Sequence, residues 1–365
     1  MLFASYTKFT KDGNYMAKRE KNDQTEQRLR QAERLRRVLL ELPEVCYDFI
    51  LSMESNSSIL TRINYAGDLR IFFTYLHDEA GLFDKPVPQL LPEDIARVQP
   101  RHIEMYLDYL SIYERDDRLL ENRNPGKKRK LSAVRTFFKY MLKHRYIKET
   151  PTAIVETPRI IEKPILHLDG PEVLDLMQAA ETGENLTKHQ ATYHRSTQTR
   201  DLALLSLMLG TGIRISECVG LNLQDMDFAR RSFRVTRKGG KQAILYYSED
   251  VQRALDDYMA LRDQARPLAG HQDALFLSMQ NRRITARAVE NLVHKYATTA
   301  VPLKKITPHK LRSTFGTALY RATGDIYLVA DVLGHRDVNT TRKHYADMSE
   351  ENRRKAAEAV HYEKK

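Results

Sequence analysis

The stretch "TRDLALLSLMLGTGIRISECVGL" occupies residues 199–221 and sets the character of the C-terminal half of the chain. Its Leu and Ala residues follow helical spacing, and Gly210 and Gly212 end the predicted helix. Arg214 follows on a tight Gly-X-Gly turn among apolar residues, where a guanidinium would be unusually buried and needs an anionic partner. Glu217, three residues further on, is suited to orient Arg214, either as a structural ion pair or as support for a site that binds another anion.

The sequence after this stretch predicts a small sheet followed by helices. Residues 226–248 alternate as two strands, with Phe233 and Val235 before a Lys-Gly-Gly-Lys turn and Ile244 and Tyr246 after it, which indicates a β-hairpin. Helices are expected over 249–263, 285–299 and 308–322, then as two short helices up to Tyr345 and a charged helical tail. The fold class predicted is therefore mainly α with a small β-sheet (α+β).

The N-terminal half reads differently, because from Ser57 to about Pro151 the pattern is helical throughout. Its aromatic and leucine stripes are typical of the core of a helical bundle. Three prolines between 148 and 166 favour an extended linker. The domains predicted are the following: a charged extension at 1–50, partly helical or disordered; a helical domain at 51–155; a linker at 156–166; a second domain at 167–350; and a helical tail at 351–365.

Composition narrows the class of partner. The chain of 365 residues has a formal net charge of +11, which favours a polyanion such as nucleic acid. Its two cysteines, Cys46 and Cys218, form neither a disulfide framework nor a zinc pattern, so we expect a reducing cytoplasm. No apolar run approaches the roughly 20 residues that span a bilayer, and the N-terminal apolar stretch is too short for a signal peptide.

Three further stretches place cations or a hydroxyl where they could act together. Thr307 and Pro308 begin a helix whose first turn carries His309 and Arg312, and such a turn favours a phosphate. The hairpin turn carries Lys238 and Lys241, although a lysine on an exposed turn is more often only solvated. The stretch "DVLGHRDVNTTRKHY" (331–345) predicts a helix closed by Gly334, then His335, and a second capped helix that ends in Tyr345. Tyr327, further upstream, is interpreted as a packing residue.

In this chain order, Arg, Lys, His-x-x-Arg, His and Tyr resemble the active site of the tyrosine recombinase (phage integrase-like) family. The resemblance covers about residues 57–350 and is carried by "TGIRISE", "HKLRSTFGT" and "LGHRDVNTT…Y". It implies an N-terminal core-binding (SAM-like) domain and a catalytic domain that form a C-shaped clamp around DNA. In many relatives the tyrosine lies nine residues after the second histidine, whereas Tyr345 lies ten after His335.

The resemblance also implies a role for each residue. Arg214 and Arg312 would clamp the scissile phosphate, and His309 and His335 would add hydrogen bonds or assist proton transfer. Lys238 would protonate the departing 5′ oxygen, because it aligns with the first lysine of the family's hairpin turn, but the residues alone leave Lys241 open. Tyr345 would be the nucleophile and would form a 3′-phosphotyrosine link, with Glu217 supporting Arg214.

Physical chemistry agrees with this arrangement. A phenol with an ordinary pKa of about 10 needs surrounding positive charge to act at neutral pH. No carboxylate cluster has metal-ligand spacing, so arginines would supply the stabilisation that magnesium gives other phosphoryl-transfer enzymes. No phosphate-binding P-loop motif is present either. We therefore expect no metal, no cofactor and no ATP.

The outer faces of the N-terminal half supply candidate DNA-phosphate contacts, which position a protein rather than read sequence. Any one of these cations could equally belong to a solvated face. The candidates are Arg62, Arg70, Lys127, Lys128, Arg129, Lys130, Arg135 and Lys139, together with Lys241 on the hairpin turn.

The function expected is site-specific recombination through a Holliday junction, by a homotetramer on two double-stranded DNA sites or together with a partner recombinase. The cellular location expected is the cytoplasm, on the nucleoid. The alternatives are DNA relaxation like that of type IB topoisomerases and a DNA-binding protein without catalysis. The sequence leaves open the target site, the choice between Xer-like chromosome dimer resolution and phage or transposon integration, and whether the C-terminal helix docks on a neighbouring protomer.

Overall fold

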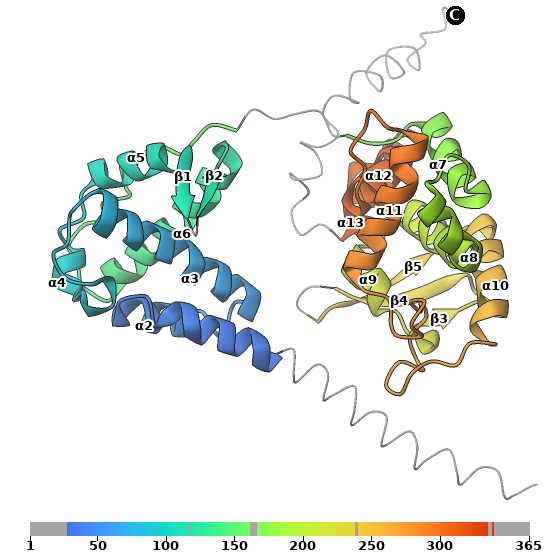
Figure 1. Ribbon diagram of the computed structural model, residues 1–365, viewed down its shortest axis with the longest axis horizontal. Helices are drawn as coiled ribbons and strands as arrows, with labels where there is room; N and C mark the ends of the chain where they lie inside the picture. Colours follow the sequence, from blue (N-terminus) through green and yellow to red (C-terminus); the bar gives the residue numbers. More distant parts are fainter. Residues whose placement is uncertain (1–27, 116, 161–165, 238–239, 335–337, 339–365) are drawn as a thin grey trace, which may run out of the picture. The chain divides into compact units, whose positions relative to one another are not determined.

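The computed structural model describes residues 28–115, 117–160, 166–237, 240–334 and 338 (Figure 1). Over this part of the chain the residues divide into two compact units, an N-terminal unit up to residue 160 and a C-terminal unit from residue 166. Among the described helices, none combines the length and the apolar content that crossing a bilayer requires. Cys46 and Cys218 are both buried, free thiols.

The N-terminal unit is a helical bundle with one β-hairpin. It begins with a helix over residues 28–39. The elements that follow are α2 (Glu44–Ser52), α3 (Ile59–Thr74), the π-helical turn η1 (Tyr75–Glu79), the 3-10 turn η2 (Val87–Gln89), α4 (Pro92–Ile95), α5 (Pro100–Tyr109), β1 (Ile112–Arg115), β2 (Arg118–Glu121) and α6 (Asn124–Lys143).

The core of this unit starts earlier in the chain than the predicted domain boundary at residue 51. Leu35 and Val38 are buried, and so are Cys46 and Phe49 of α2, which pack with the aromatic residues of α3 and α6. The Phe49 ring meets Phe137 of α6 edge-on at a centroid distance of 5.6 Å. The helical character expected for the end of the N-terminal extension is present, and the segment 35–50 contributes buried residues to the domain core.

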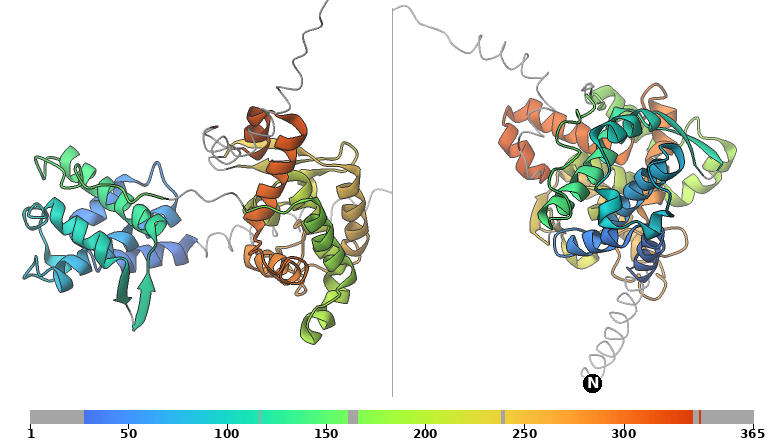
Figure 2. Two further views of the ribbon diagram at one scale, coloured as in Figure 1. Left: turned by 90° about the horizontal axis from the view of Figure 1, so that it is seen from above. Right: turned by 90° about the vertical axis from the view of Figure 1, so that its left-hand side faces the viewer.

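The expectation of helix throughout 57–151 is wrong at residues 112–121, where β1 and β2 pair antiparallel, with Tyr113 opposite Leu120. Figure 2 shows this hairpin projecting from the helices. Asp117 in its turn takes a φ of 55°, which aspartate tolerates better than most residues. Within β1, Tyr113 faces the core whereas its neighbour Ile112 is 63% exposed, as the alternating faces of a strand require.

The C-terminal unit packs helices against a three-stranded antiparallel sheet. The predicted helix end is confirmed, because α8 stops at Thr211 and Gly212 caps it at a φ of 61°. The elements of the unit are α7 (Gly170–Thr182), α8 (Lys188–Thr211), α9 (Ile215–Gly220), the 3-10 turn η3 (Leu223–Asp225), β3 (Met226–Asp227), β4 (Ser232–Thr236), β5 (Gln242–Tyr246), α10 (Glu249–Arg262), α11 (Ala286–Ala300), α12 (Pro308–Thr323) and α13 (Ile326–Leu333).

The predicted hairpin is β4–β5, in which Phe233 pairs with Leu245. The two-residue strand β3 joins the other edge of β4 and was not anticipated. Phe233, Val235 and Leu245 face the core, whereas Ile244 and Tyr246 are 61% and 70% exposed. The two residues that mark the alternation in β4 therefore face the core, whereas the two that mark it in β5 face solvent.

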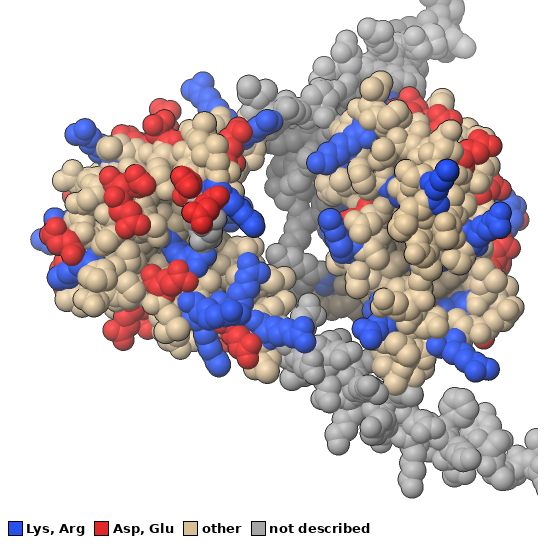
Figure 3. Space-filling model, viewed as in Figure 1, with Lys and Arg blue, Asp and Glu red and all other residues tan. Residues whose placement is uncertain are grey.

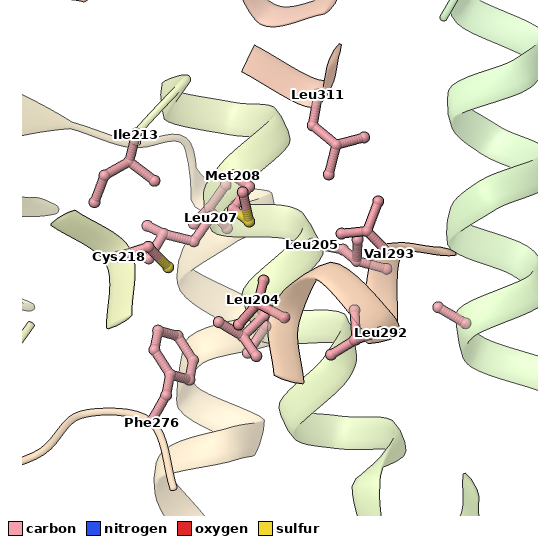
Figure 4. Close-up of a cluster of buried hydrophobic side chains, with 14 of the residues drawn as sticks. Leu204, Leu205, Leu207, Met208, Ile213, Cys218, Phe276, Leu292, Val293 and Leu311 are labelled. Atoms are coloured by element: carbon pink, nitrogen blue, oxygen red, sulfur yellow. The ribbon is translucent and has the colours of Figure 1, made fainter. Parts of the chain in front are cut away.

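The core of the C-terminal unit is built around α8. Figure 4 shows Leu205 of this helix beside Val293 of α11, and both belong to one buried cluster with Leu204, Met208 and Leu311 of α12. Burial of such side chains contributes about 25 cal/mol for each Å² removed from water. This packing fixes the end of α8 and the start of α12 relative to one another, while Val329 and Leu333 of α13 pack against Phe315 and Leu319 of α12 in a second, smaller cluster. The candidate site lies where these three helix ends meet.

Candidate functional site

The turn after α8 depends on glycine. A Cβ on Gly212 would lie 2.5 Å from Cδ1 of Phe315 and 2.8 Å from Cδ2 of Leu333. The turn is further fixed by Thr211, whose Oγ1 donates to the carbonyl of Leu207 at 2.6 Å. This geometry places Arg214 at the N-cap of α9, facing the end of α13.

Arg214 and Glu217 make the contact that their spacing suggested. Nη1 of Arg214 lies 2.7 Å from Oε1 of Glu217, and the backbone N–H of Arg214 donates to Oε2 at 3.1 Å. The Arg214 side chain is 35% exposed and that of Glu217 only 7%. One carboxylate thus caps α9 and orients the guanidinium, while part of the guanidinium still faces solvent.

The first turn of α12 carries His309 and Arg312 as predicted, but at different depths. His309 is exposed, whereas Arg312 is only 5% exposed. Nη1 of Arg312 donates to the carbonyl of Gly212 at 2.5 Å, and Nη2 donates to the carbonyl of Leu333. Arg312 therefore connects the start of α12 to both the end of α8 and the end of α13.

Three arginines converge on the C-terminal end of α13. Nη2 of Arg214 donates to the carbonyl of Gly334 at 2.8 Å, next to the Leu333 carbonyl that Arg312 binds. The third is Arg237, which donates to the carbonyl of Asp331 at 3.0 Å and to that of Val332 at 2.7 Å. The last carbonyls of a helix lack partners within the helix and carry partial negative charge, so cations are stabilised there.

Sequence reasoning missed Arg237. It stands directly before the Lys-Gly-Gly-Lys turn, and the sequence pattern marks only the two lysines of that turn as candidate chemical groups. Its pKa is lowered, first by burial and then by the charge of Arg214, while Glu217 and Asp331 act in the opposite direction. The sequence feature that could have identified Arg237 is its place directly before a tight turn, from which a long side chain can reach a neighbouring element.

Lys238, His335 and Tyr345 lie outside the described residues. The residues that flank Lys238 form a tight hairpin connection, in which the N–H of Arg237 donates to the carbonyl of Lys241 at 2.7 Å and that of Gly240 donates to the carbonyl of Arg237 at 3.0 Å. Gly240 has a φ of 78°, in the left-handed region that glycine adopts readily. Lys241 is exposed. His335 directly follows Gly334, the last described residue before the gap.

Tyr327 is 71% exposed on α13, so its interpretation as a packing residue is wrong. The buried positions of this helix are Val329, Ala330 and Leu333, which pack against Phe315 and Leu319 of α12. Tyr327 lies in the first turn of α13, on the side that these residues leave open to solvent.

Most candidate DNA contacts of the N-terminal unit are engaged within the protein. Arg62 lies 3.4 Å from a carboxylate oxygen of Glu54, and Arg70 lies 2.7 Å from one of Glu41. Nζ of Lys127 donates to Oγ of Ser111 at 2.6 Å. The guanidinium of Arg135 donates to Oγ1 of Thr157 at 2.6 Å and to the carbonyl of Val155 at 2.5 Å.

Two more of these candidates, Arg129 and Lys130, lie next to the carboxylate of Asp68. Its two carboxylate oxygens accept from both Nη atoms of Arg129, and Nζ of Lys130 lies 3.8 Å away. Lys130 is only 6% exposed, and burial lowers the pKa of its amine against the opposing effect of Asp68. The amine of Lys130 is therefore not placed to contact DNA.

Lys128 and Lys139 differ from their neighbours on α6. Both are exposed, and neither has a hydrogen bond or an ion pair within the part of the chain that the structure describes. Figure 3 shows cationic and acidic side chains interspersed on the visible face of this unit. Within the described ranges, no group of three or more His, Cys, Asp or Glu side chains is arranged to hold a metal ion.

Comparison with known proteins gives a consistent result. A family model described as "Phage integrase family" matches residues 167–352. The tyrosine recombinase XerC of Syntrophus aciditrophicus (strain SB) is 30% identical over 305 residues, which cover 82% of this chain and 91% of the relative. The XerC of Leptospira interrogans serogroup Icterohaemorrhagiae serovar copenhageni is 28% identical over 322 residues, covering 88% of this chain and 94% of that relative.

Solved structures share the fold. The XerH site-specific recombinase bound to palindromic difH substrate, in a post-cleavage complex, matches with a TM-score of 0.64 at 19% identity, covering 83% of this chain and 81% of that one. The Tn1549 transposon integrase in complex with transposon right end DNA matches with a TM-score of 0.62 at 18% identity, covering 86% and 99%.

Proposed function

The chain belongs to the phage integrase family and is a tyrosine-type site-specific recombinase, and we propose that Tyr345 is the nucleophile with which it cuts DNA. The observation that carries this assignment is the set of three guanidiniums at the end of α13. The carbonyls that they bind directly precede, in the sequence, the segment that contains His335 and Tyr345. A phenol becomes nucleophilic where positive charge surrounds it, and these arginines supply that charge.

In the proposed reaction, the phenol of Tyr345 gives its proton to one of the two histidines, its oxygen attacks the scissile phosphorus, and the bond from phosphorus to the 5′ oxygen breaks. The phosphate stays on Tyr345 as a 3′-phosphotyrosine, and the departing 5′ oxygen takes a proton from Lys238. A 5′ hydroxyl from the partner strand then gives its proton back to Lys238 and attacks the phosphotyrosine, and the released phenolate takes its proton back from the histidine. Because each step exchanges one phosphodiester for another, the cycle needs no ATP.

The arginines stabilise charge that develops on the nonbridging oxygens in the transition state. Each Nη of a guanidinium carries two N–H bonds, so the contacts of Arg214 with Glu217 and Gly334 leave further donors on its exposed side. Arg312 is buried, so its contact with the phosphate requires its guanidinium to open toward the site. We assign His309 and His335 to the same phosphoryl group, as hydrogen-bond donors or in proton transfer.

DNA positioning is assigned to exposed cations. On α6 these are Lys128 and Lys139, and on the hairpin turn Lys241. Arg62, Arg70, Lys127, Arg129 and Arg135 would need to exchange a present partner for a phosphate, which lowers the gain from each contact. We do not propose Lys130 as a DNA contact, because its amine is buried against Asp68.

Recombination joins two duplexes, so we propose that four copies of this chain, or copies together with a partner recombinase, assemble on two specific DNA sites and pass through a Holliday junction. The reaction belongs in the cytoplasm, on the nucleoid. Residues 351–365 are proposed to contact a neighbouring protomer. The target is proposed to be either an Xer-like resolution site or the end of a mobile element.

The test is covalent capture of DNA. The purified protein is incubated with sheared genomic DNA, and fragments that stay attached in detergent are sequenced. A duplex carrying the enriched sequence, nicked so that the short fragment with the new 5′ hydroxyl diffuses away, then serves as a suicide substrate. We expect Tyr345→Phe to bind this duplex as the wild type does and to capture none of it.

The matched control is Tyr327→Phe, which removes an exposed phenol from α13. This variant should capture DNA at the wild-type rate. Covalent capture by Tyr345→Phe would refute the assignment of the nucleophile. Loss of capture in both variants would show that the assay reports something other than attack by Tyr345.

A further inference from the structure

The guanidinium of Arg237 is fixed by contacts with the backbone of another element, unlike that of an ordinary surface arginine. Both Nη atoms of its guanidinium donate to carbonyls at the end of α13, from Asp331 and Val332. Its Nε is buried and has no hydrogen-bond partner among the described residues. A buried donor without a partner is unfavourable, so the position is not explained by hydrogen bonding alone.

The same guanidinium lies against the backbone of Gly334. A Cβ at this position would clash with Nη1, Cζ and Nε of Arg237. Gly334 also has a φ of 63°, a left-handed conformation in which a side chain is strained. Only glycine allows the guanidinium to lie so close, and the fold places it there.

Gly334 is also the residue that holds Arg214, through the bond from Nη2 to its carbonyl at 2.8 Å. Arg237 contacts Gly334 through its guanidinium and binds the two carbonyls that precede Leu333. A shift of Arg237 would therefore move the end of α13, and with it the carbonyl that orients Arg214.

We propose that Arg237 is a positioning residue of the cleavage site, which fixes the end of α13 and through Gly334 holds Arg214 in place for the scissile phosphate. This inference rests on the proposed role of Arg214. Displacing a group that contacts the phosphate by about 1 Å can cost about 10²-fold in rate. Arg237 itself needs no contact with the DNA.

The test compares two substrates in single-turnover cleavage. One is the suicide duplex obtained by covalent capture. The other is the same duplex with a methyl group in place of one nonbridging oxygen of the scissile phosphate, which makes that phosphate neutral. A neutral phosphate needs less stabilisation by an arginine, so a defect that arises from a misplaced Arg214 should shrink on it. A defect that arises from general loss of structure should not.

We expect Arg237→Ala to lose about 10²-fold in cleavage rate on the ordinary duplex, and to lose much less on the methyl-substituted duplex. Arg214→Ala should follow the same pattern. The double variant should be no slower than Arg214→Ala alone, because two residues that act through one contact are not additive. Binding of the ordinary duplex should change little in either single variant.

Arg237→Lys provides a second measurement should the alanine variant fold poorly. A lysine keeps the charge but cannot bind two carbonyls through a planar fork, so an intermediate loss with the same dependence on substrate is expected. Arg234→Ala is the matched control, since Arg234 lies on β4, is 52% exposed and pairs only loosely with Asp225 at 3.7 Å. It should cleave both duplexes at the wild-type rate.

An equal defect of the Arg237 variants on both duplexes, while that of Arg214→Ala shrinks, would overturn the role of Arg237 and leave the proposed function intact. Wild-type cleavage by Arg237→Ala would overturn it as well. If the defect of Arg214→Ala is itself the same on both duplexes, the phosphate contact of Arg214 is refuted, and the inference for Arg237 falls with it.

Discussion

Two groups of arginines, one in each unit, bind different partners. On α3 and α6 of the N-terminal unit, Arg62, Arg70 and Arg129 pair with the carboxylates of Glu54, Glu41 and Asp68. At the end of α13 in the C-terminal unit, Arg237 and Arg312 donate to backbone carbonyls, and Arg214 does so in addition to its pair with Glu217.

The difference matters because a carboxylate cancels the charge of an arginine, whereas a carbonyl satisfies its donors and leaves the charge in place. The cluster in the C-terminal unit therefore keeps a net positive charge for an incoming phosphate. The pairs in the N-terminal unit instead stabilise the bundle. We therefore expect the carboxylate-paired arginines of α3 and α6 to serve stability and those at the end of α13 to serve chemistry, and substitutions should separate the two uses.

The largest effect is expected at Asp68, the carboxylate of the N-terminal unit that Arg129 and Lys130 share. Asp68→Ala leaves the buried amine of Lys130 without a counter-charge, which should lower the free energy of unfolding by about 3–5 kcal/mol. Urea denaturation measures this change. Asp84→Ala, at an exposed position, is the control and should be nearly neutral. A loss at Asp68 no larger than that of the control would show that this pair does not stabilise the bundle.

The next effect concerns a buried arginine that binds carbonyls. Arg312→Lys should reduce the rate of cleavage by about 10²-fold, because an ammonium cannot reproduce the planar fork. Arg262→Lys is a matched control away from the site, since Arg262 is 6% exposed and donates to the carbonyls of Gln272 and Ala274. Both variants should lose stability, but only Arg312→Lys should lose cleavage at temperatures where each is folded. Equal cleavage losses would mean that the carbonyl-bound arginines act only through stability.

The features of the site that depend on neighbouring residues in the chain, namely the helix ends and one ion pair, could be predicted from the sequence. The end of α8 at Gly212, the start of α12 at Pro308 and the closure of α13 at Gly334 all follow from glycine and proline at defined positions. The ion pair between Arg214 and Glu217 follows from their spacing, because Glu217 reaches back to cap α9.

The sequence could not predict the contacts made across the fold. Arg237 and the α13 carbonyls that it binds are more than 90 residues apart, and only the packing of α8, α12 and α13 brings them together. The burial of Lys130 could not be predicted from the sequence for the same reason, since its partner Asp68 lies on another helix. The β1–β2 hairpin was missed because its strands are short and follow directly on the apolar pattern of α5.

The smallest effect separates two lysines that stand two positions apart on α6. Lys128 is exposed and Lys130 is 6% exposed, although the sequence presents both as part of one basic run. Lys128→Ala should weaken binding of the captured duplex and reduce the slope of log affinity against log salt concentration by about 1, as expected when one phosphate contact is lost. Lys130→Ala should leave that slope unchanged and instead alter the free energy of unfolding, since its amine faces Asp68. Binding titrations at several salt concentrations, with each variant checked for folding, measure both slopes. A lower slope for Lys130→Ala would return this residue to the DNA surface and would mean that charges paired with carboxylates in the N-terminal unit are released when DNA binds.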